Sequence, residues 1–242
     1  LNNYKKILLL NTEGSKHQKQ QFFVKVFRFV GNLLAPIFIM FNVSANKITL
    51  LAFILGITSC LLIINNNVYI AITIYVISGI LDHIDGTVAR FNDKASFYGR
   101  FIDGFTGIIL STFIKLSISI LVFNLIGFNY IFWIGIIATV ICPIHYLYYN
   151  RYSTFARWIN EEYSDISIKP YLRNKMPFFY NNANDFQNFL LFCLPIYYNF
   201  QYYNSLIILI YFLVNIFMAI FTINSYTLSA YRNFLVPAKK HR

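Results

Sequence analysis

Charged residues are scarce in this sequence, since Asp, Glu, Lys and Arg make up only 12% of its 242 residues. Soluble domains usually carry about 25%. Hydrophobic residues reach 57% and aromatic residues 19%. This composition excludes an ordinary soluble domain and is typical of an integral membrane protein. No polar segment is long enough to bury a core of its own, so we expect a single membrane domain.

Cysteine is also rare. The three cysteines, Cys60, Cys142 and Cys193, lie in apolar runs without the spacing of metal ligands. This argues against a zinc site and against a disulfide framework. The opening stretch, LNNYKKILLLNTEGSKHQKQ, lacks a long apolar core followed by a small-residue cleavage site. A signal peptide is therefore not expected.

Long apolar runs predict an all-α membrane protein with six transmembrane helices. A span needs about 20 residues, and the second run reaches this length if its helix continues to about Arg90. The fifth run, FQNFLLFCLPIYYNF, is the weakest and contains Pro195. The predicted spans are residues 48–64, 68–81, 101–123, 128–149, 186–200 and 206–226.

The distribution of basic residues supports this arrangement and orients it. The connections NNN, NLIGFN and QYYNS contain no Lys or Arg, and Lys115 in the third span is the exception among 20 basic residues. The positive-inside rule makes the basic side, with both termini, cytoplasmic. The net charge of +11 then reflects topology and anionic lipid headgroups, and no nucleic-acid partner is expected.

Residues 1–43 precede the membrane domain of residues 44–242. The segment QQFFVKVFRFVGNLLAPIFIMF combines Lys25 and Arg28 with a broad apolar surface. It predicts an amphipathic helix lying in the membrane interface, which Pro36 would break or bend. A re-entrant membrane segment is the alternative.

Three aspartates lie in the stretch LDHIDGTVARFNDKASFYGRFIDGFTG. In the six-span arrangement, Asp82, Asp85 and Asp103 meet at the cytoplasmic end of an antiparallel helix pair. Three converging carboxylates repel each other unless a cation neutralises them, and oxygen ligands suit Mg²⁺ or Mn²⁺. The alternative is a set of helix-end acids paired with Arg90 and Arg100. In the helical segment DGTVAR, Asp85, Ala89 and, one step on, Arg90 face one sector, which predicts a slot for a flat anionic group that Arg90 could bind.

The spacing of these residues resembles a known signature. The CDP-alcohol phosphotransferase family has the pattern D-x2-D-G-x2-A-R-x8-G-x3-D-x3-D, and every fixed position matches except the last, where Gly107 replaces aspartate. The segment SANKITLLAFILG is also similar to the Thr-Pro-Asn-x-x-Thr segment that opens the first span of the family, with Ala45 in place of proline. The resemblance is strong over residues 44–110.

The resemblance implies an enzyme and a set of site residues. An acceptor hydroxyl would attack the β-phosphorus of a CDP-linked donor, form a phosphodiester and release CMP, as in phospholipid synthesis; donor or acceptor is usually a lipid. The site would lie on the cytoplasmic side, with Asp82, Asp85 and Asp103 as ligands of Mg²⁺ or Mn²⁺. Family members are commonly homodimers, although no residue here indicates it. By analogy, the CDP-binding residues are Asp82, Asp85, Gly86, Ala89, Arg90 and Gly99.

Gly107 leaves the activity open. The family aspartate at this position is the proposed base and a ligand to a second metal, and glycine can be neither. Engineered inactivation, natural loss of activity, and activity with another base all remain. The main alternative to an enzyme is a degenerate protein that binds CDP-lipid or metal without turnover. A transporter is disfavoured, because the acids lie at one membrane face and the motif is not repeated.

The acceptor cannot be identified from the sequence. The stretches RYSTFARW and KPYLRNK, between the fourth and fifth spans, offer basic residues that could bind an acceptor phosphate. The alternative is that they only follow the positive-inside rule.

Overall fold

The computed structural model describes residues 22–163, 167–169, 177–199 and 205–235. Within these ranges every regular element is an α-helix, as expected for an all-α protein. The helices are α2 (Phe22–Met40), α3 (Ala45–Ile64), α4 (Val68–Phe91), α5 (Phe97–Ile126), α6 (Tyr130–Glu162), α7 (Pro177–Phe192), α8 (Leu194–Asn199) and α9 (Ser205–Asn233).

Six of the described helices are long and apolar enough to cross a membrane, namely α2, α3, α4, α5, α6 and the Leu206–Asn233 part of α9. Five of them coincide with predicted spans, and α4 continues to Phe91, as expected for the second. The predicted fifth span instead falls on α7 and α8, which are interrupted at Cys193. Its apolar part, Asp185–Ile196, is shorter than a span. The sixth candidate is α2.

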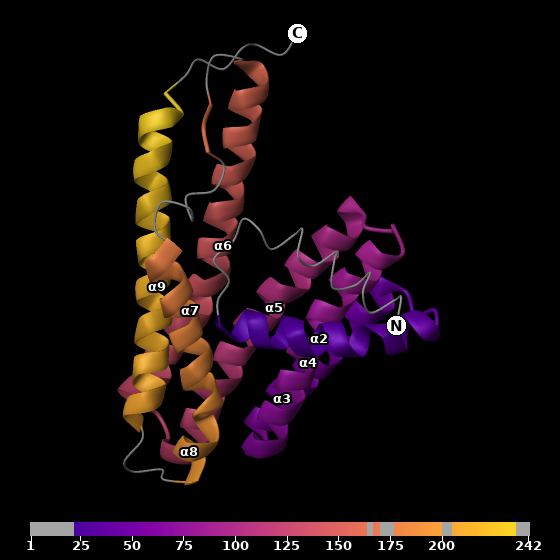
Figure 1. The fold of residues 1–242 in the computed structure, drawn as a ribbon. Coiled ribbons are helices and arrows are strands. Elements are labelled where there is room, and N and C mark those ends of the chain that lie inside the picture. Colours follow the sequence, from indigo (N-terminus) through magenta and orange to yellow (C-terminus); the bar gives the residue numbers. More distant parts are fainter. Residues whose placement is uncertain (1–21, 164–166, 170–176, 200–204, 236–242) are drawn as a thin grey trace.

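Helix α2 lies across the molecule, at a steep angle to the long helices α6 and α9 (Figure 1). The carboxylate of Asp185 in α7 holds its first turn, accepting hydrogen bonds from the backbone N–H groups of Phe22 (2.7 Å) and Phe23 (3.2 Å). The helix continues through Pro36 without a break. Length and composition alone qualify α2 as a span, whereas its crosswise course fits the predicted interfacial helix, which stays a prediction.

Small and hydroxylic residues let α3, α4 and α5 pack closely. The Ser59 hydroxyl donates to the Ala71 carbonyl at 2.8 Å, and the Ser78 hydroxyl donates to the Ala52 carbonyl at 2.7 Å. Such pairs join α3 to α4 where water is absent. At Gly56, a side chain would lie only 2.6 Å from Leu110 of α5, so glycine permits the contact between α3 and α5.

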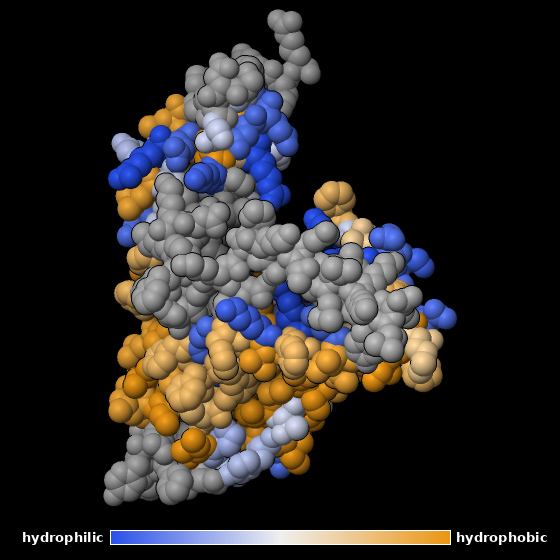
Figure 2. Space-filling model, viewed as in Figure 1, coloured by the Kyte–Doolittle hydropathy of each residue, from blue (hydrophilic) through white to orange (hydrophobic). Residues whose placement is uncertain are grey.

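Helices α6 and α9 run side by side along the length of the molecule (Figure 1). Gly135 lets α6 approach its neighbours, since a Cβ there would lie 2.7 Å from the Phe212 ring of α9. With 33 residues, α6 is about 50 Å long and exceeds a hydrocarbon core of about 30 Å. The surface is also divided along this direction. Figure 2 shows apolar residues gathered over the lower part of the visible face, with hydrophilic residues above them.

Two further expectations can be placed on the fold. All three cysteines are free. The stretch RYSTFARW continues α6 beyond the predicted fourth span, and the Arg151 guanidinium lies 5.0 Å from the Phe155 ring centre. Residues 170–175 of KPYLRNK lie outside the described residues.

Candidate functional site

The end of α4 and the start of α5 bring Asp82, Asp85 and Asp103 together. One carboxylate oxygen from each residue lies within 4.8 Å of the others. Asp85 is buried, with 6% of its surface exposed, whereas Asp82 and Asp103 are exposed. The cluster thus has one carboxylate held inside the protein and two at an accessible edge.

Thr49 of α3 holds the buried carboxylate in place. Its hydroxyl donates to Asp85 Oδ2 at 2.5 Å and also lies 3.1 Å from the Ala45 carbonyl. A hydrogen bond of this kind fixes the orientation of a metal-binding side chain. Thr49 was not among the predicted site residues, although its segment resembles the one that opens the first span of the family. The signal was present, because Thr49 is the last fixed position of SANKIT.

The start of α5 is shaped by its cap. The Ser96 hydroxyl accepts a hydrogen bond from the Gly99 N–H at 3.0 Å, which is the usual arrangement at a helix N-terminus. A Cβ at Gly99 would lie 3.3 Å from that hydroxyl and 3.7 Å from the Asn46 amide oxygen of α3. Glycine therefore keeps the backbone accessible one turn before Asp103.

The donor set fits the predicted ion. Three carboxylates and no softer ligand suit Mg²⁺ or Mn²⁺, and within the described ranges no Cys or His joins this group. His83 instead lies against α2, with its ring centre 6.3 Å from that of Phe27. On α6, the His145 Nδ1 atom forms a hydrogen bond of 2.9 Å with the Cys142 carbonyl oxygen.

Arg90 and Gly86 lie side by side on α4, next to the aspartates. The Arg90 guanidinium contacts the Thr87 hydroxyl at 3.4 Å, and this hydroxyl donates to the Asn32 side chain of α2 at 3.2 Å. A Cβ at Gly86 would lie 3.2 Å from Arg90 Nη1. A larger residue at position 86 would displace the guanidinium. Ala89 is half-buried beside it.

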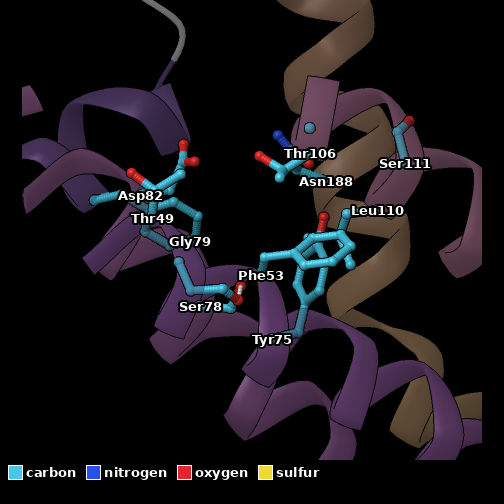
Figure 3. Close-up of a pocket in the computed structure, with 13 residues that line it drawn as sticks. Thr49, Phe53, Tyr75, Ser78, Gly79, Asp82, Thr106, Leu110, Ser111 and Asn188 are labelled. Atoms are coloured by element: carbon cyan, nitrogen blue, oxygen red, sulfur yellow. Dashed lines mark hydrogen bonds between the residues drawn. The ribbon is translucent and has the colours of Figure 1, made fainter. Parts of the chain in front are cut away.

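A pocket of about 200 Å³ opens beside Asp82 and reaches between α3, α4, α5 and α7. In Figure 3, Asp82 lies on one side of this space and Ser111 on the other, and the Tyr75 hydroxyl points into it. Tyr75, Ser78 and Ser111 were not among the predicted site residues. Their only signal was a polar group within an apolar run.

Gly107 also lines the pocket. It is exposed, and within the described part of the chain a Cβ built there would meet no atom within 4 Å outside its own helix backbone. Asp93, the remaining acid of the motif region, lies in the turn between α4 and α5 and is not part of the carboxylate cluster. Position 107 therefore borders open space in the same pocket that Asp82 lines.

One protein family matches most of the chain. No curated protein matches it. Residues 42–231, from the turn before α3 to the last turns of α9, match the CDP-alcohol phosphatidyltransferase family. This range includes the three aspartates, Arg90, Gly99 and every residue that lines the pocket except Phe27. The chain belongs to the CDP-alcohol phosphatidyltransferase family.

Proposed function

We propose that this protein is a multi-pass membrane transferase that moves a phospho-alcohol or phosphatidyl group from a CDP-linked donor to an acceptor hydroxyl. The products are CMP and a phospholipid or related phosphodiester. One observation carries the proposal: in a chain of this family, three carboxylates lie within 4.8 Å of one another at the edge of a pocket. The basic residues around the site support its placement on the cytoplasmic side.

The three aspartates and Thr49 are assigned to ion binding. Asp82, Asp85 and Asp103 would hold Mg²⁺ or Mn²⁺, and Thr49 fixes the buried carboxylate among them. When bound, such an ion neutralises the donor diphosphate and favours the departure of CMP.

On the nucleotide side, Arg90 supplies positive charge next to the cluster. Gly86 leaves room for its guanidinium, while Gly99 keeps the start of α5 open to the diphosphate. Ala89 completes the proposed slot for cytidine. These assignments follow the family motif residue by residue, and the contacts of Arg90 and Gly86 support them.

The acceptor enters through the pocket that Gly107 lines. Gly107 cannot take a proton from the acceptor hydroxyl, and loss of a general base typically costs about 10²–10⁴ in rate. This observation favours a second candidate function, a protein that binds CDP-lipid and metal without turnover.

Turnover separates the two candidates. Purified protein in nanodiscs is given labelled CDP-diacylglycerol or water-soluble CDP-alcohols, a panel of acceptor alcohols and Mg²⁺, and CMP release is measured. We expect Mg²⁺-dependent release that Asp85→Asn abolishes. Asp93→Asn is the matched control and should leave CMP release unchanged. Asp93 is exposed, and its positive φ of 53° is one that asparagine also adopts.

The other outcomes are equally informative. Mg²⁺-dependent binding of CDP without CMP release from any donor would support the non-catalytic candidate. Release that continues in EDTA, or that Asp85→Asn leaves unchanged, would refute the proposed role of the aspartates.

A further inference from the structure

Helix α2 lies outside the range that matches the family, which begins at residue 42. It nevertheless packs across α4 (Figure 1). A Cβ at Gly31 would lie 3.4 Å from the Ile80 carbonyl oxygen and 3.5 Å from the His83 Cβ. Side chains of α2 therefore reach the part of α4 that carries the first two aspartates of the cluster.

One edge of α2 is polar. Lys25, Arg28 and Asn32 follow one another at intervals of three and four residues, so they lie along the same edge of the helix. Beside this edge, Gly31 and Ala35 are buried. The opposite side of α2 exposes a stripe of apolar residues, which includes Phe22, Val26, Phe29 and Leu33. This distribution fits a helix at the membrane surface with its polar edge turned toward headgroups and water.

Arg28 brings a second guanidinium group close to that of Arg90. Arg28 is half-buried and interacts electrostatically with both His83 and Arg90. Asp85 also acts on Arg90, with the opposite sign. Among the residues that the structure describes, none accepts a hydrogen bond from Arg28. Two neighbouring guanidinium groups repel each other, and a group with several acceptor oxygens between them removes this cost.

The surface of α4 leaves room for such a group. Arg90 Nη2 donates to the Thr87 hydroxyl at 3.4 Å, and this hydroxyl donates to the Asn32 amide oxygen at 3.2 Å, which joins Arg90 to the polar edge of α2. Gly86 has no side chain to fill the space next to the Arg90 guanidinium. Asp82, Gly86 and Arg90 follow at intervals of four residues, so position 86 lies about 6 Å along the helix from Asp82. A ligand held over Gly86 is thus next to the proposed ion site.

The chemistry of the two arginines favours a phosphate group. Guanidinium groups bind phosphate oxygens through paired N–H donors, and a tetrahedral phosphate has enough oxygens to bind two of them at once. Such a phosphate has two possible sources. One is the diphosphate of a CDP-linked donor on the neighbouring ion, and the other is the headgroup of an anionic lipid beside α2.

We propose that Arg28 and Arg90 form a phosphate subsite over Gly86, built jointly by α2 and α4. Arg28 is then a ligand-binding residue that comes from outside the range matching the family. Where the phosphate is that of the donor, the inference rests on the proposed function and adds Arg28 to its donor site.

Nucleotide binding tests the subsite. The purified protein, in nanodiscs of neutral phosphatidylcholine with Mg²⁺, is titrated with CDP in a calorimeter, and cytidine is measured by displacement of labelled CDP. We expect Arg28→Met to weaken CDP by at least about tenfold, and Arg28→Lys to retain most of the affinity. Cytidine, which has no phosphate, should bind to Arg28→Met as it does to the unchanged protein.

Lys25→Met is the matched control, because it removes the same charge from an exposed position one turn away on α2. It should leave the affinity for CDP unchanged. If Arg28→Met does not fold, Arg28→Gln takes its place, with the same expected loss. An equal loss of CDP and cytidine binding in the Arg28 variant, or a loss of CDP binding in Lys25→Met as large as in Arg28→Met, would overturn the proposal.

A second measurement identifies the source of the phosphate. Thermal stability without nucleotide is compared in nanodiscs with and without phosphatidylglycerol. If this lipid stabilises the protein only when Arg28 is present, and CDP binding does not depend on Arg28, the subsite stands and its ligand is a lipid headgroup. If neither CDP affinity nor stabilisation by the lipid depends on Arg28, the subsite is refuted. Absence of Mg²⁺-dependent CDP binding in the unchanged protein would refute the proposed function instead, and the lipid measurement would then decide the subsite alone.

Discussion

Replacing Gly107 with aspartate should restore or raise transferase activity while changing donor affinity by only a few-fold. The new carboxylate would lie on the same face of α5 as Asp103, four residues further along and about 6 Å deeper in the membrane. Among the residues that the structure describes, no atom beyond the local helix backbone lies within 4 Å of a Cβ at position 107, so the side chain fits without displacing a described neighbour. Position 107 also lines the pocket through which we propose that the acceptor enters.

The size of the effect follows from the role of a general base. Such a group contributes about 10²–10⁴ in rate, which corresponds to about 3–5 kcal/mol of barrier. The change costs little in helix formation, since aspartate and glycine differ by only a few tenths of a kcal/mol in helix propensity. We therefore expect a gain in kcat on the order of 10² or more, without loss of folded protein.

Initial rates of CMP release, measured against donor and acceptor concentration, provide the assay. Gly104→Asp is the matched control: it places the same carboxylate on the same helix, at another site with no atom within 4 Å of its Cβ, but outside the pocket lining. Gly107→Asn adds a similar side chain without a base. Neither variant should raise the rate as Gly107→Asp does.

One result would refute this reasoning. If the protein with Gly107 is already fully active and aspartate slows it, the chain uses another base, and the catalytic step implied by the family pattern does not apply here. The proposed metal site would not be affected by that result.

Three further predictions concern topology, metal affinity and packing. A cysteine introduced at residues 65–67, on a background without the native cysteines, should react with an impermeant reagent from outside; labelling only after permeabilisation would reverse the orientation. Thr49→Val should weaken Mg²⁺-dependent CDP binding by about 10–100-fold, because it removes the hydrogen bond to Asp85, and an unchanged affinity would show that this bond does not matter. Gly135→Ala should lower thermal stability by about 1–3 kcal/mol through overpacking, whereas Gly104→Ala, at an open position, should not; equal stability of the two variants would contradict the close contact of α6 with α9.

The sequence was sufficient to predict the helical class and most of the spans, because the length of an apolar run directly reflects the thickness of the bilayer. The prediction was less reliable where an apolar segment is short and interrupted by polar residues or proline. The fifth predicted span proved to be two short helices interrupted at Cys193. Pro36 was expected to break or bend its helix, and α2 continues through Pro36 without a break.

The convergence of the aspartates was predictable because helix pairs bring residues near a short turn together. The contact between Thr49 and Asp85 was not predicted, since the two residues lie 36 positions apart and meet only through packing of α3 on α4. The same holds for the pocket, whose wall combines Tyr75 of α4 with Ser111 of α5. Isolated polar residues in apolar runs signal such sites, but their partners depend on the tertiary structure.

The central claim is that the three aspartates hold a divalent ion in contact with the phosphates of a CDP-linked donor. Electron–nuclear double resonance of Mn²⁺ bound to the purified protein, in the presence of CDP, tests it most directly. We predict protein-bound Mn²⁺ with phosphorus coupling from CDP, which is lost in Asp85→Asn and kept in Asp93→Asn. Bound Mn²⁺ without phosphorus coupling, or coupling that persists in Asp85→Asn, would contradict the claim.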